Sequence, residues 1–126
     1  MTGKSVLVVD DTNDNLILIG TLLRSAGLEV STAANGIIAL EMVKHKNFDL
    51  VVMDIQMPHL DGLEVTTILR MRGYERPVIA CTAFGNGGAF LQSESAKFDA
   101  YLAKPLMRAD LLSCVEKLVM EANHDD

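Results

Sequence analysis

The sequence predicts an α/β domain with a doubly wound, five-stranded parallel sheet and helices on both of its faces. Along the 126 residues, short apolar runs alternate with segments whose apolar residues recur at a helical period. Strands separated by helices pair in parallel and are covered on both faces. In addition, aspartate, threonine or lysine follows or ends four of the apolar runs at the carboxyl end. In a parallel sheet these ends meet at one edge, where the functional crevice lies.

The first strand and helix are predicted over residues 5–27. Residues 5–9 (SVLVV) form an apolar, β-branched run typical of a buried strand. Thr12 or Asn13 can cap the helix that follows, and Gly27 can end it. The apolar residues of this helix fall on one face: Leu16, Ile19, Leu23 and Ala26.

The second and third units repeat this order. Residues 28–33 (LEVSTA) alternate like a strand, and the Asn-Gly pair at 35–36 can open a helix. The apolar residues in register on that helix are Ile37, Leu40 and Val43. Residues 50–53 (LVVM) are the third strand, and Asp61 can cap a helix that ends near Gly73. The apolar face of this third helix comprises Val65, Ile68 and Leu69.

The C-terminal part of the chain is predicted to complete the sheet. Pro77 starts a fourth strand over 78–81 (VIAC), and the fifth strand is 100–103 (AYLA). Glycines after the fourth strand are poor helix formers, so we expect a long loop there and a short fourth helix over 89–96. An amphipathic stripe follows Met107 and comprises Leu111, Leu112, Val115, Leu118, Val119 and Ala122. We expect each of these apolar stripes to pack in the core.

Composition is typical of a small globular domain. With 49% hydrophobic residues the chain can bury a core without disulfides, and we expect one domain over 1–126, with its core at about 4–120 and a short acidic tail. No apolar run reaches the roughly 18 residues of a membrane span, and the chain does not start with a secretory signal. The net charge of −6 argues against direct binding to nucleic acid or anionic lipid. Cys81 and Cys114 match no metal or disulfide spacing, which favours a reducing setting.

The polar residues at the strand ends form a candidate site. Asp10 and Asp11 follow the first strand, Asp54 the third, Thr82 the fourth and Lys104 the fifth. Crowded carboxylates repel one another, and Mg²⁺ suits them because it prefers oxygen ligands and binds through a few carboxylates, waters and a phosphate oxygen. A carboxylate can attack phosphorus, while a lysine and a hydroxyl can bind the transferred group. These residues therefore predict a site that takes a phosphoryl group onto Asp54.

Four short motifs resemble, in this order, the receiver domain of bacterial two-component response regulators: VVDD, MDIQMPxxDG, TA and YLAKP. The likeness extends from Lys4 to about Met120, and MDIQMP together with Asn15 is most similar to receivers of hybrid histidine kinases and phosphorelays. The resemblance implies a flavodoxin-like fold with strand order 2-1-3-4-5. It also implies a phosphoacceptor in signal transduction that catalyses only its own phosphorylation and dephosphorylation, rather than an enzyme acting on a separate substrate.

The resemblance assigns the metal and the phosphoacceptor to named residues. Asp54 would accept the phosphoryl group, and Asp10, Asp11 and Asp54 would hold Mg²⁺, with Mn²⁺ as an alternative. Asp11 would bind the metal directly, and the backbone carbonyl of Gln56 would be the remaining protein ligand.

The same resemblance implies that Thr82, Ala83 and Lys104 bind the phosphoryl oxygens. Thr82 and Tyr101 would act as the switch, with Thr82 moving toward the phosphoryl group and Tyr101 turning inward behind it. The peptide bond between Lys104 and Pro105 is expected to be cis.

The resemblance also implies that two further side chains border the path of the water that removes the phosphoryl group. They are Gln56 and Phe84, each two positions after a site residue. A phenylalanine cannot orient the attacking water and its bulk can screen the phosphorus, which predicts slow dephosphorylation. The alternative, to which we give equal weight, is that Phe84 only packs at the loop or points to solvent.

The partner implied by the resemblance is a histidine kinase or a histidine phosphotransfer protein, with no direct binding to nucleic acid or membrane. The expected location is the cytoplasm, or the cytoplasmic part of a membrane-bound hybrid kinase, and the oligomeric state stays open. Nothing after residue 122 could form an output domain. The chain would therefore bind another protein, pass its phosphoryl group to a histidine, or be part of a longer kinase.

Two other classes of protein remain open. A pseudo-receiver binds proteins without phosphorylation, and the loss of Asp54, Lys104 or the acidic pair would favour it, but all are present. An aspartate-based phosphatase would need an acid where Gln56 stands. A flavin-binding electron carrier would need a hydroxyl- and glycine-rich loop after the first strand, where the sequence reads DDTN.

Overall fold

The structure is a computed structural model that describes residues 2–83 and 98–123. Helices and strands alternate through the described chain. The elements are β1 (Ser5–Val9), α1 (Asn13–Ser25), β2 (Glu29–Ala33), α2 (Gly36–His45), β3 (Leu50–Asp54), α3 (Gly62–Met71), β4 (Val78–Thr82), β5 (Ala100–Ala103) and α5 (Arg108–Asn123). The predicted short helix over 89–96 lies outside the described residues.

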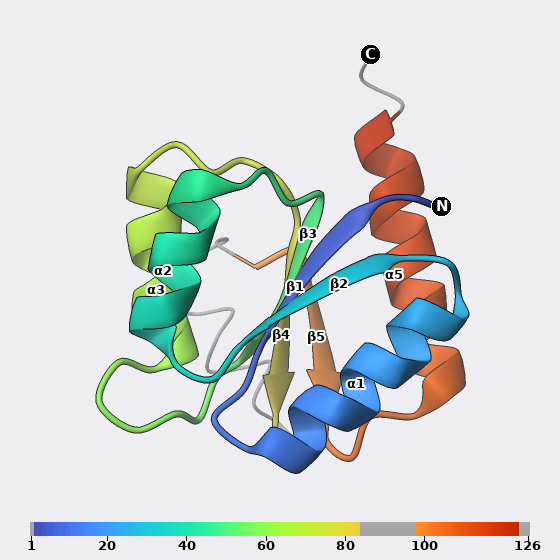
Figure 1. Ribbon diagram of the computed structural model, residues 1–126, viewed down its shortest axis with the longest axis horizontal. Helices are drawn as coiled ribbons and strands as arrows, with labels where there is room; N and C mark the ends of the chain where they lie inside the picture. The colour runs from blue at the N-terminus through green and yellow to red at the C-terminus, as the bar shows by residue number, and fades with distance from the viewer. Residues whose placement is uncertain (1, 84–97, 124–126) are drawn as a thin grey trace.

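The five strands pair in parallel in the order β2-β1-β3-β4-β5. Helices α1 and α5 cover one face of this sheet, and α2 and α3 cover the other (Figure 1). The chain reverses its direction across the sheet after β2, so that β1 and β3 lie side by side at the point where the strand order changes. The predicted doubly wound α/β fold is confirmed, with the strand order that the resemblance implied.

Burial follows from this layering. All residues of β3 and β4 are buried, because these strands have neighbours on both sides and helices on both faces, whereas the edge strands β2 and β5 are mostly half-buried or exposed. The core on the α1 and α5 side includes Val6, Val8, Leu16, Ile19, Leu23, Val52, Ile79, Leu111 and Val115. The core on the α2 and α3 side includes Leu7, Val9, Ala39, Phe48, Val51, Met53, Val65, Leu69 and Ala80.

The helix ends agree with the residues that predicted them. The Asp61 side chain accepts a hydrogen bond from the Glu64 backbone, and the Glu64 side chain accepts one from the Asp61 backbone, which makes a capping box. Asn35 caps α2 by a single bond, in which its side chain accepts from the amide of Ile38. Thr12 is the N-cap residue of α1, but its side chain makes no capping hydrogen bond.

One predicted apolar stripe does not pack as expected. Ile37 is 70% exposed, so the expectation that it lies in the core is wrong. Helix α2 buries Gly36 and Ala39 instead. The reason is close packing between helices: a Cβ on Gly36 would collide with the side chain of Val65, so the small residues of α2 face α3.

A repeated Phe-Asp pair fixes the opposite end of the sheet, and sequence reasoning missed it. Phe48 and Phe98 are buried, and each is followed by an aspartate just before a strand. Asp49 Oδ2 accepts a hydrogen bond from the Ser5 amide at 2.8 Å. Asp99 Oδ2 accepts one from the amide of Val78, the first residue of β4, at 2.9 Å. These bonds satisfy backbone donors at the start of two strands.

Within the described part of the chain, every helix is too short or too polar to cross a bilayer.

Candidate functional site

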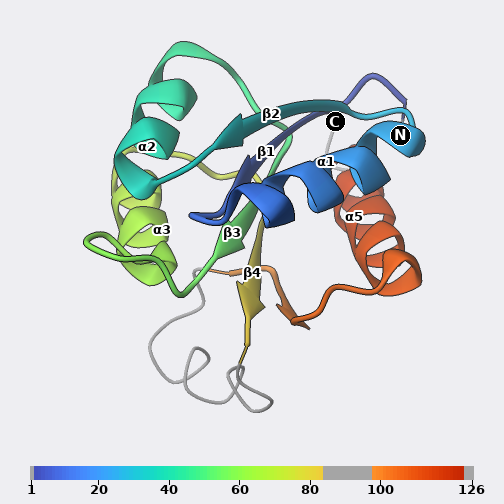
Figure 2. The same cartoon turned by 60° about the horizontal axis from the view of Figure 1, so that its bottom comes forward.

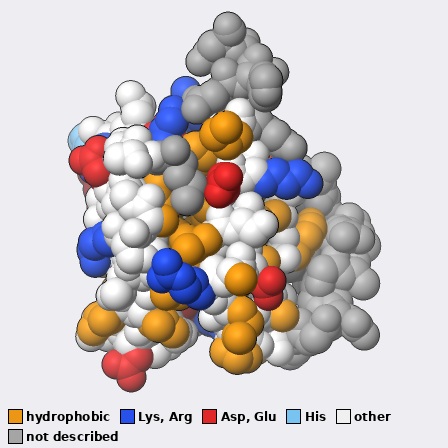
Figure 3. All heavy atoms as spheres, turned by 90° about the vertical axis from the view of Figure 1, so that its right-hand side faces the viewer, with side chains coloured by type: hydrophobic (Ala, Val, Ile, Leu, Met, Phe, Trp, Pro, Cys, Tyr) orange, Lys and Arg blue, Asp and Glu red, His pale blue; other side chains and the backbone are white. Residues whose placement is uncertain are grey.

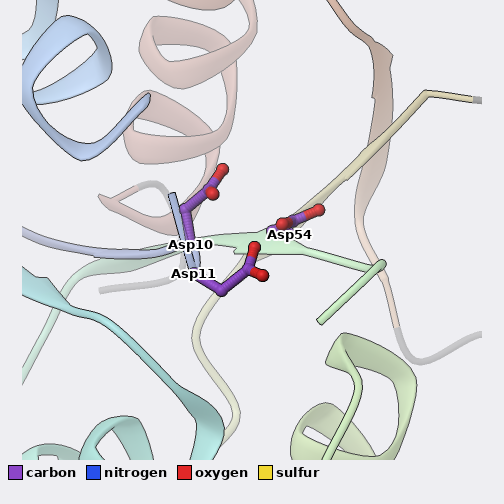
Figure 4. A group of neighbouring side chains, drawn as sticks. All are labelled: Asp10, Asp11 and Asp54. Atoms are coloured by element: carbon purple, nitrogen blue, oxygen red, sulfur yellow. The ribbon is translucent and has the colours of Figure 1, made fainter. Parts of the chain in front are cut away.

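Three carboxylates gather at the carboxyl edge of the sheet. Asp54 is the last residue of β3, and Asp10 and Asp11 follow β1 directly. Because β1 and β3 are paired in parallel, their ends place the three side chains together (Figure 4), with one oxygen of each within 4.8 Å of the others. Asp10 and Asp54 are only 1% and 2% exposed, whereas Asp11 is open to solvent.

Lys104 neutralises part of this negative charge. Its Nζ lies 3.2 Å from Asp10 Oδ2 and 3.1 Å from Asp54 Oδ1, so that it bridges the two buried carboxylates. The Lys104 amide donates to the Thr82 carbonyl at 2.8 Å, which extends the β4–β5 pairing and directs the loop into the site. The bond between Lys104 and Pro105 is cis.

The surroundings of the site raise the pKa values of Asp54 and Lys104. Burial raises the pKa of Asp54, and the nearby charge of Asp10 raises it further, against the opposing effect of the Gln56 amide and Lys104. Burial by itself would lower the pKa of Lys104, but its hydrogen bond and attraction to Asp54, with the charge of Asp10, outweigh burial and raise it. The lysine therefore stays charged, and the carboxylate is held in an unfavourable site.

Backbone and amide donors orient the two buried acids. The Thr12 amide donates to Asp10 Oδ1 at 2.9 Å, and the Asn15 side chain approaches the same oxygen at 3.4 Å. The Gln56 amide donates to Asp54 Oδ1 at 3.1 Å. Each carboxylate is thus held in place by the turn that follows its own strand.

The Gln56 side chain makes a contact that sequence reasoning did not predict. Its Oε1 accepts a hydrogen bond from the Ala83 amide at 3.1 Å, which links the loop after β3 to the loop after β4. The pair lies opposite each other when the register Asp54–Cys81 is extended by two residues. The register is a property of the folded sheet, so the sequence pattern alone did not indicate this contact.

The remaining predicted residues occupy different surroundings. Thr82 is the last residue of β4 and is 3% exposed, next to the carboxylates' edge. Tyr101 is half-buried on β5, and its ring meets that of Phe98 edge-on, with centroids 5.9 Å apart. Phe84 lies outside the described residues.

Cys81 lies beside Asp54 in the sheet but is unsuited to nucleophilic chemistry. It is 1% exposed, and burial raises the pKa of its thiol to about 12. The thiolate needed for attack is therefore scarce at neutral pH. The Cys81 thiol therefore contributes no reactive group to this part of the site.

The donor set fits a hard divalent cation. All the atoms that converge from Asp10, Asp11 and Asp54 are carboxylate oxygens, and one lysine opposes three acids. Mg²⁺ is bound by such oxygen ligands in combination with water and phosphate. The residues at this edge therefore fit Mg²⁺ together with a phosphoryl group.

Comparison with known proteins agrees with the fold and the motifs. The family model of the response regulator receiver domain matches residues 6–116. The transcriptional regulatory protein PrrA of Mycobacterium tuberculosis is 38% identical over 119 residues, which are 94% of this chain and 51% of PrrA. The polar-differentiation response regulator DivK of Brucella anthropi is 34% identical over 121 residues, 94% of this chain and 98% of DivK. The chain thus spans about half of PrrA and nearly all of DivK.

A solved structure extends the comparison to the site. The receiver domain of the sensor histidine kinase PA1611 of Pseudomonas aeruginosa superposes with a TM-score of 0.84 and 32% identity, over 94% of this chain and 98% of that one. That receiver is described with a magnesium ion coordinated in its active-site cleft.

Proposed function

This chain is a receiver domain of the two-component response regulator family, and from this premise we propose that Asp54 accepts a phosphoryl group from a phosphohistidine. The observation that carries the proposal is the position of Asp54. Its carboxylate is buried at the carboxyl end of a central strand, bridged to Asp10 by Lys104 and held by the Gln56 amide.

The proposed transfer makes one bond and breaks another. An Asp54 carboxylate oxygen bonds to phosphorus, the P–N bond to the donor imidazole breaks, and the imidazole leaves with the electron pair and takes up a proton. The product is an acyl phosphate on Asp54. Lys104, the Thr82 hydroxyl and the Ala83 amide would bind the phosphoryl oxygens. Thr82 ends β4, which pairs with β3, and Ala83 follows it, whereas Lys104 follows β5, the next strand of the sheet.

We propose that Asp10, Asp11, Asp54 and the backbone carbonyl of Gln56 hold Mg²⁺. When bound, the metal would offset the charge that builds up on the phosphoryl oxygens. Lys104 would keep its contact with the phosphoryl group, because its raised pKa keeps the ammonium charged. Mn²⁺ would serve in place of Mg²⁺, since both accept carboxylate and water ligands.

The proposed donor is a histidine kinase or a histidine phosphotransfer protein. A hollow of about 290 Å³ opens beside Lys104 and is lined by Asn15, Leu18, Ile19, Lys104, Pro105 and Leu106. Leu18 is 50% exposed. The side of the molecule that α1 and α5 cover carries hydrophobic side chains between acidic and basic ones (Figure 3), a mixture suited to reversible docking. Such a donor would place this chain in the cytoplasm.

We further propose that residues 4–120 form one receiver domain, which the family match over 6–116 supports. Phosphorylation would be followed by movement of Thr82 toward the phosphoryl group and of Tyr101 behind it. The chain would act on no separate substrate. The pseudo-receiver remains the second candidate, and it differs from the first in one measurable property, the absence of phosphorylation.

The test is incubation with Mg²⁺ and acetyl phosphate, followed by intact mass measurement. We expect one added phosphoryl group that hydroxylamine removes, because an acyl phosphate reacts with that nucleophile. Asp54→Asn should abolish the addition. Asp61→Asn is the matched control, since Asp61 is an acid outside the site whose capping role asparagine can keep. Phosphorylation that survives in Asp54→Asn contradicts the assignment, and none in the wild type favours the pseudo-receiver.

A further inference from the structure

We propose that the Gln56 side chain is a latch that occupies the Ala83 amide until a phosphoryl oxygen replaces it. This inference rests on the proposed function, since it concerns phosphoryl binding at Asp54. It assigns the side chain of Gln56 a positioning role in phosphoryl uptake, separate from the metal ligand proposed for its backbone carbonyl.

The argument begins with the hydrogen-bond ladder between β3 and β4. The Val51 amide donates to the Pro77 carbonyl, and the Ile55 amide donates to the Cys81 carbonyl. In a parallel pair, a strand residue that donates to one carbonyl accepts from the amide two residues further along the partner strand. The regular continuation of this ladder is therefore a bond from the Ala83 amide to the Ile55 carbonyl.

That continuation is not made, and the Ile55 carbonyl instead accepts a hydrogen bond from the start of α3. The Gly62 amide donates to the Ile55 carbonyl at 3.1 Å. Gly62 can come this close because it has no side chain: a Cβ there would collide with the Asp54 carbonyl. The start of α3 thus ends the ladder one step early and leaves the Ala83 amide to find its partner within the site.

Gln56 supplies that partner. Its Oε1 accepts from Ala83 at 3.1 Å, while its own amide donates to Asp54 Oδ1 at 3.1 Å. The residue therefore contacts the carboxylate through one group and the neighbouring loop through another. While the Ala83 N–H donates to the uncharged Gln56 Oε1, it is not available to donate to a ligand oxygen.

An anionic phosphoryl oxygen is the stronger acceptor. Hydrogen bonds to charged acceptors are shorter and about twice as strong as those between neutral groups. A phosphoryl group on Asp54 would displace Gln56 Oε1, and the side chain, whose residue is exposed, would turn to solvent. The latch is thus weaker than the ligand that replaces it, and it slows uptake without preventing it.

The test compares Gln56→Met with Gln56→Ala. Methionine keeps an unbranched side chain of similar length and loses the amide acceptor, whereas alanine loses both length and acceptor. Neither substitution removes the backbone carbonyl. In the metal-free protein, amide hydrogen exchange at Ala83 should be faster in both variants than in the wild type. Phosphorylation by acetyl phosphate with Mg²⁺, in which acetate leaves as the carboxylate, should be faster by about two- to tenfold, the range expected for one net hydrogen bond.

Each result decides the matter. Faster exchange and faster phosphorylation in both variants support the latch. A rate increase in Gln56→Ala alone means that the side chain obstructs by its bulk, and it overturns the latch. Unchanged Ala83 exchange also overturns it.

The failures of the two proposals are distinguishable. A wild type that is phosphorylated at Asp54, with variants that react at the same rate, overturns the latch and leaves the proposed function standing. A wild type that takes no phosphoryl group overturns the proposed function and the latch together. The increase in melting temperature with Mg²⁺ should be the same in all three proteins, and a smaller increase in the variants would assign their effect to the metal and overturn the latch.

Discussion

Asp54 and Lys104 interact at 3.1 Å, and their raised pKa values have opposite consequences at neutral pH. A carboxyl group with a raised pKa binds its proton more tightly in the folded protein. The free energy of unfolding therefore falls as the pH rises from the ordinary carboxyl pKa through the raised one. For Lys104 the raised pKa contributes stability at neutral pH, and this contribution is lost only as the pH rises through its folded-state pKa. The lysine stabilises a site that the ionised aspartate strains.

Asp54→Asn should therefore stabilise the metal-free protein at pH 7. Asparagine removes the buried charge and its repulsion with Asp10, and it keeps an acceptor for the Gln56 amide. It also loses the attraction to Lys104, but burial and repulsion outweigh that attraction, because the pKa of Asp54 is raised on balance. We expect a gain on the order of 1 kcal/mol, which corresponds to a melting temperature about 4 °C higher. Thermal unfolding in EDTA measures it.

The gain should shrink as the pH falls through the raised pKa of Asp54 and should be gone below the ordinary carboxyl pKa, where the aspartate of the wild type is as neutral as the asparagine of the variant. A variant that melts below the wild type without metal at pH 7 would show that the acidic site is not strained.

At the scale of elements, the start of α3 determines where β3 ends. The capping box fixes Asp61 as the N-cap of α3. Gly62, the first residue of the helix, contacts the backbone of Asp54 and Ile55. Helix α2 approaches α3 by a second close contact, at Gly36. The loops that carry the site are therefore positioned by helix packing as well as by the sheet (Figure 2).

Gly62→Ala should destabilise the protein, because its Cβ would overlap the Asp54 carbonyl and lie 2.9 Å from the Ile55 Cα, and backbone cannot give way easily. Overpacking of this kind costs about 1–3 kcal/mol. Urea unfolding, followed by circular dichroism, measures the change.

Gly20→Ala is the matched control. It lies within α1, and its nearest neighbour is the flexible end of Arg24 at 3.2 Å. The same substitution there should be neutral or stabilising by up to about 1 kcal/mol, since alanine is the better helix former. If both variants lose the same stability, close approach at Gly62 is not the cause.

The whole molecule carries a net charge of −6, and three of its acids meet at one point. Folding brings Asp10, Asp11 and Asp54 together, whereas the unfolded chain keeps them apart. A cation that binds this cluster binds the folded state alone. The site is thus connected to the stability of the entire domain.

Mg²⁺ should raise the melting temperature in proportion to the logarithm of its concentration once the site is saturated. At ten times the dissociation constant the gain is about 1.4 kcal/mol. Differential scanning calorimetry across a Mg²⁺ series measures it, with NaCl of equal ionic strength as the control for charge screening. Equal shifts with both salts would count against a specific cation site, and Asp54→Asn should respond less than the wild type.

The sequence by itself determined the order of strands and helices, most of their boundaries and the group of residues at the edge of the sheet. These properties are local: the apolar period distinguishes strand from helix, and Asn35, Asp61 and Gly73 form turns and caps through their own neighbours. Asp10 and Asp54 could be placed together because parallel pairing brings strand ends to one edge. The arrangement of β2-β1-β3-β4-β5 came from resemblance, since a period along the chain does not specify which strands become neighbours.

Only the tertiary structure decided how the side chains share the space between elements. Ile37 has the period of a core residue and is exposed, because the close contact of Gly36 with α3 turns the small residues inward. Gln56 accepts from the Ala83 amide where the ladder would have used the Ile55 carbonyl, and that carbonyl instead accepts from Gly62 of a different element. Both outcomes depend on which atoms of a neighbouring element occupy the space beside a residue. That information lies in the packing of distant segments rather than in any local pattern.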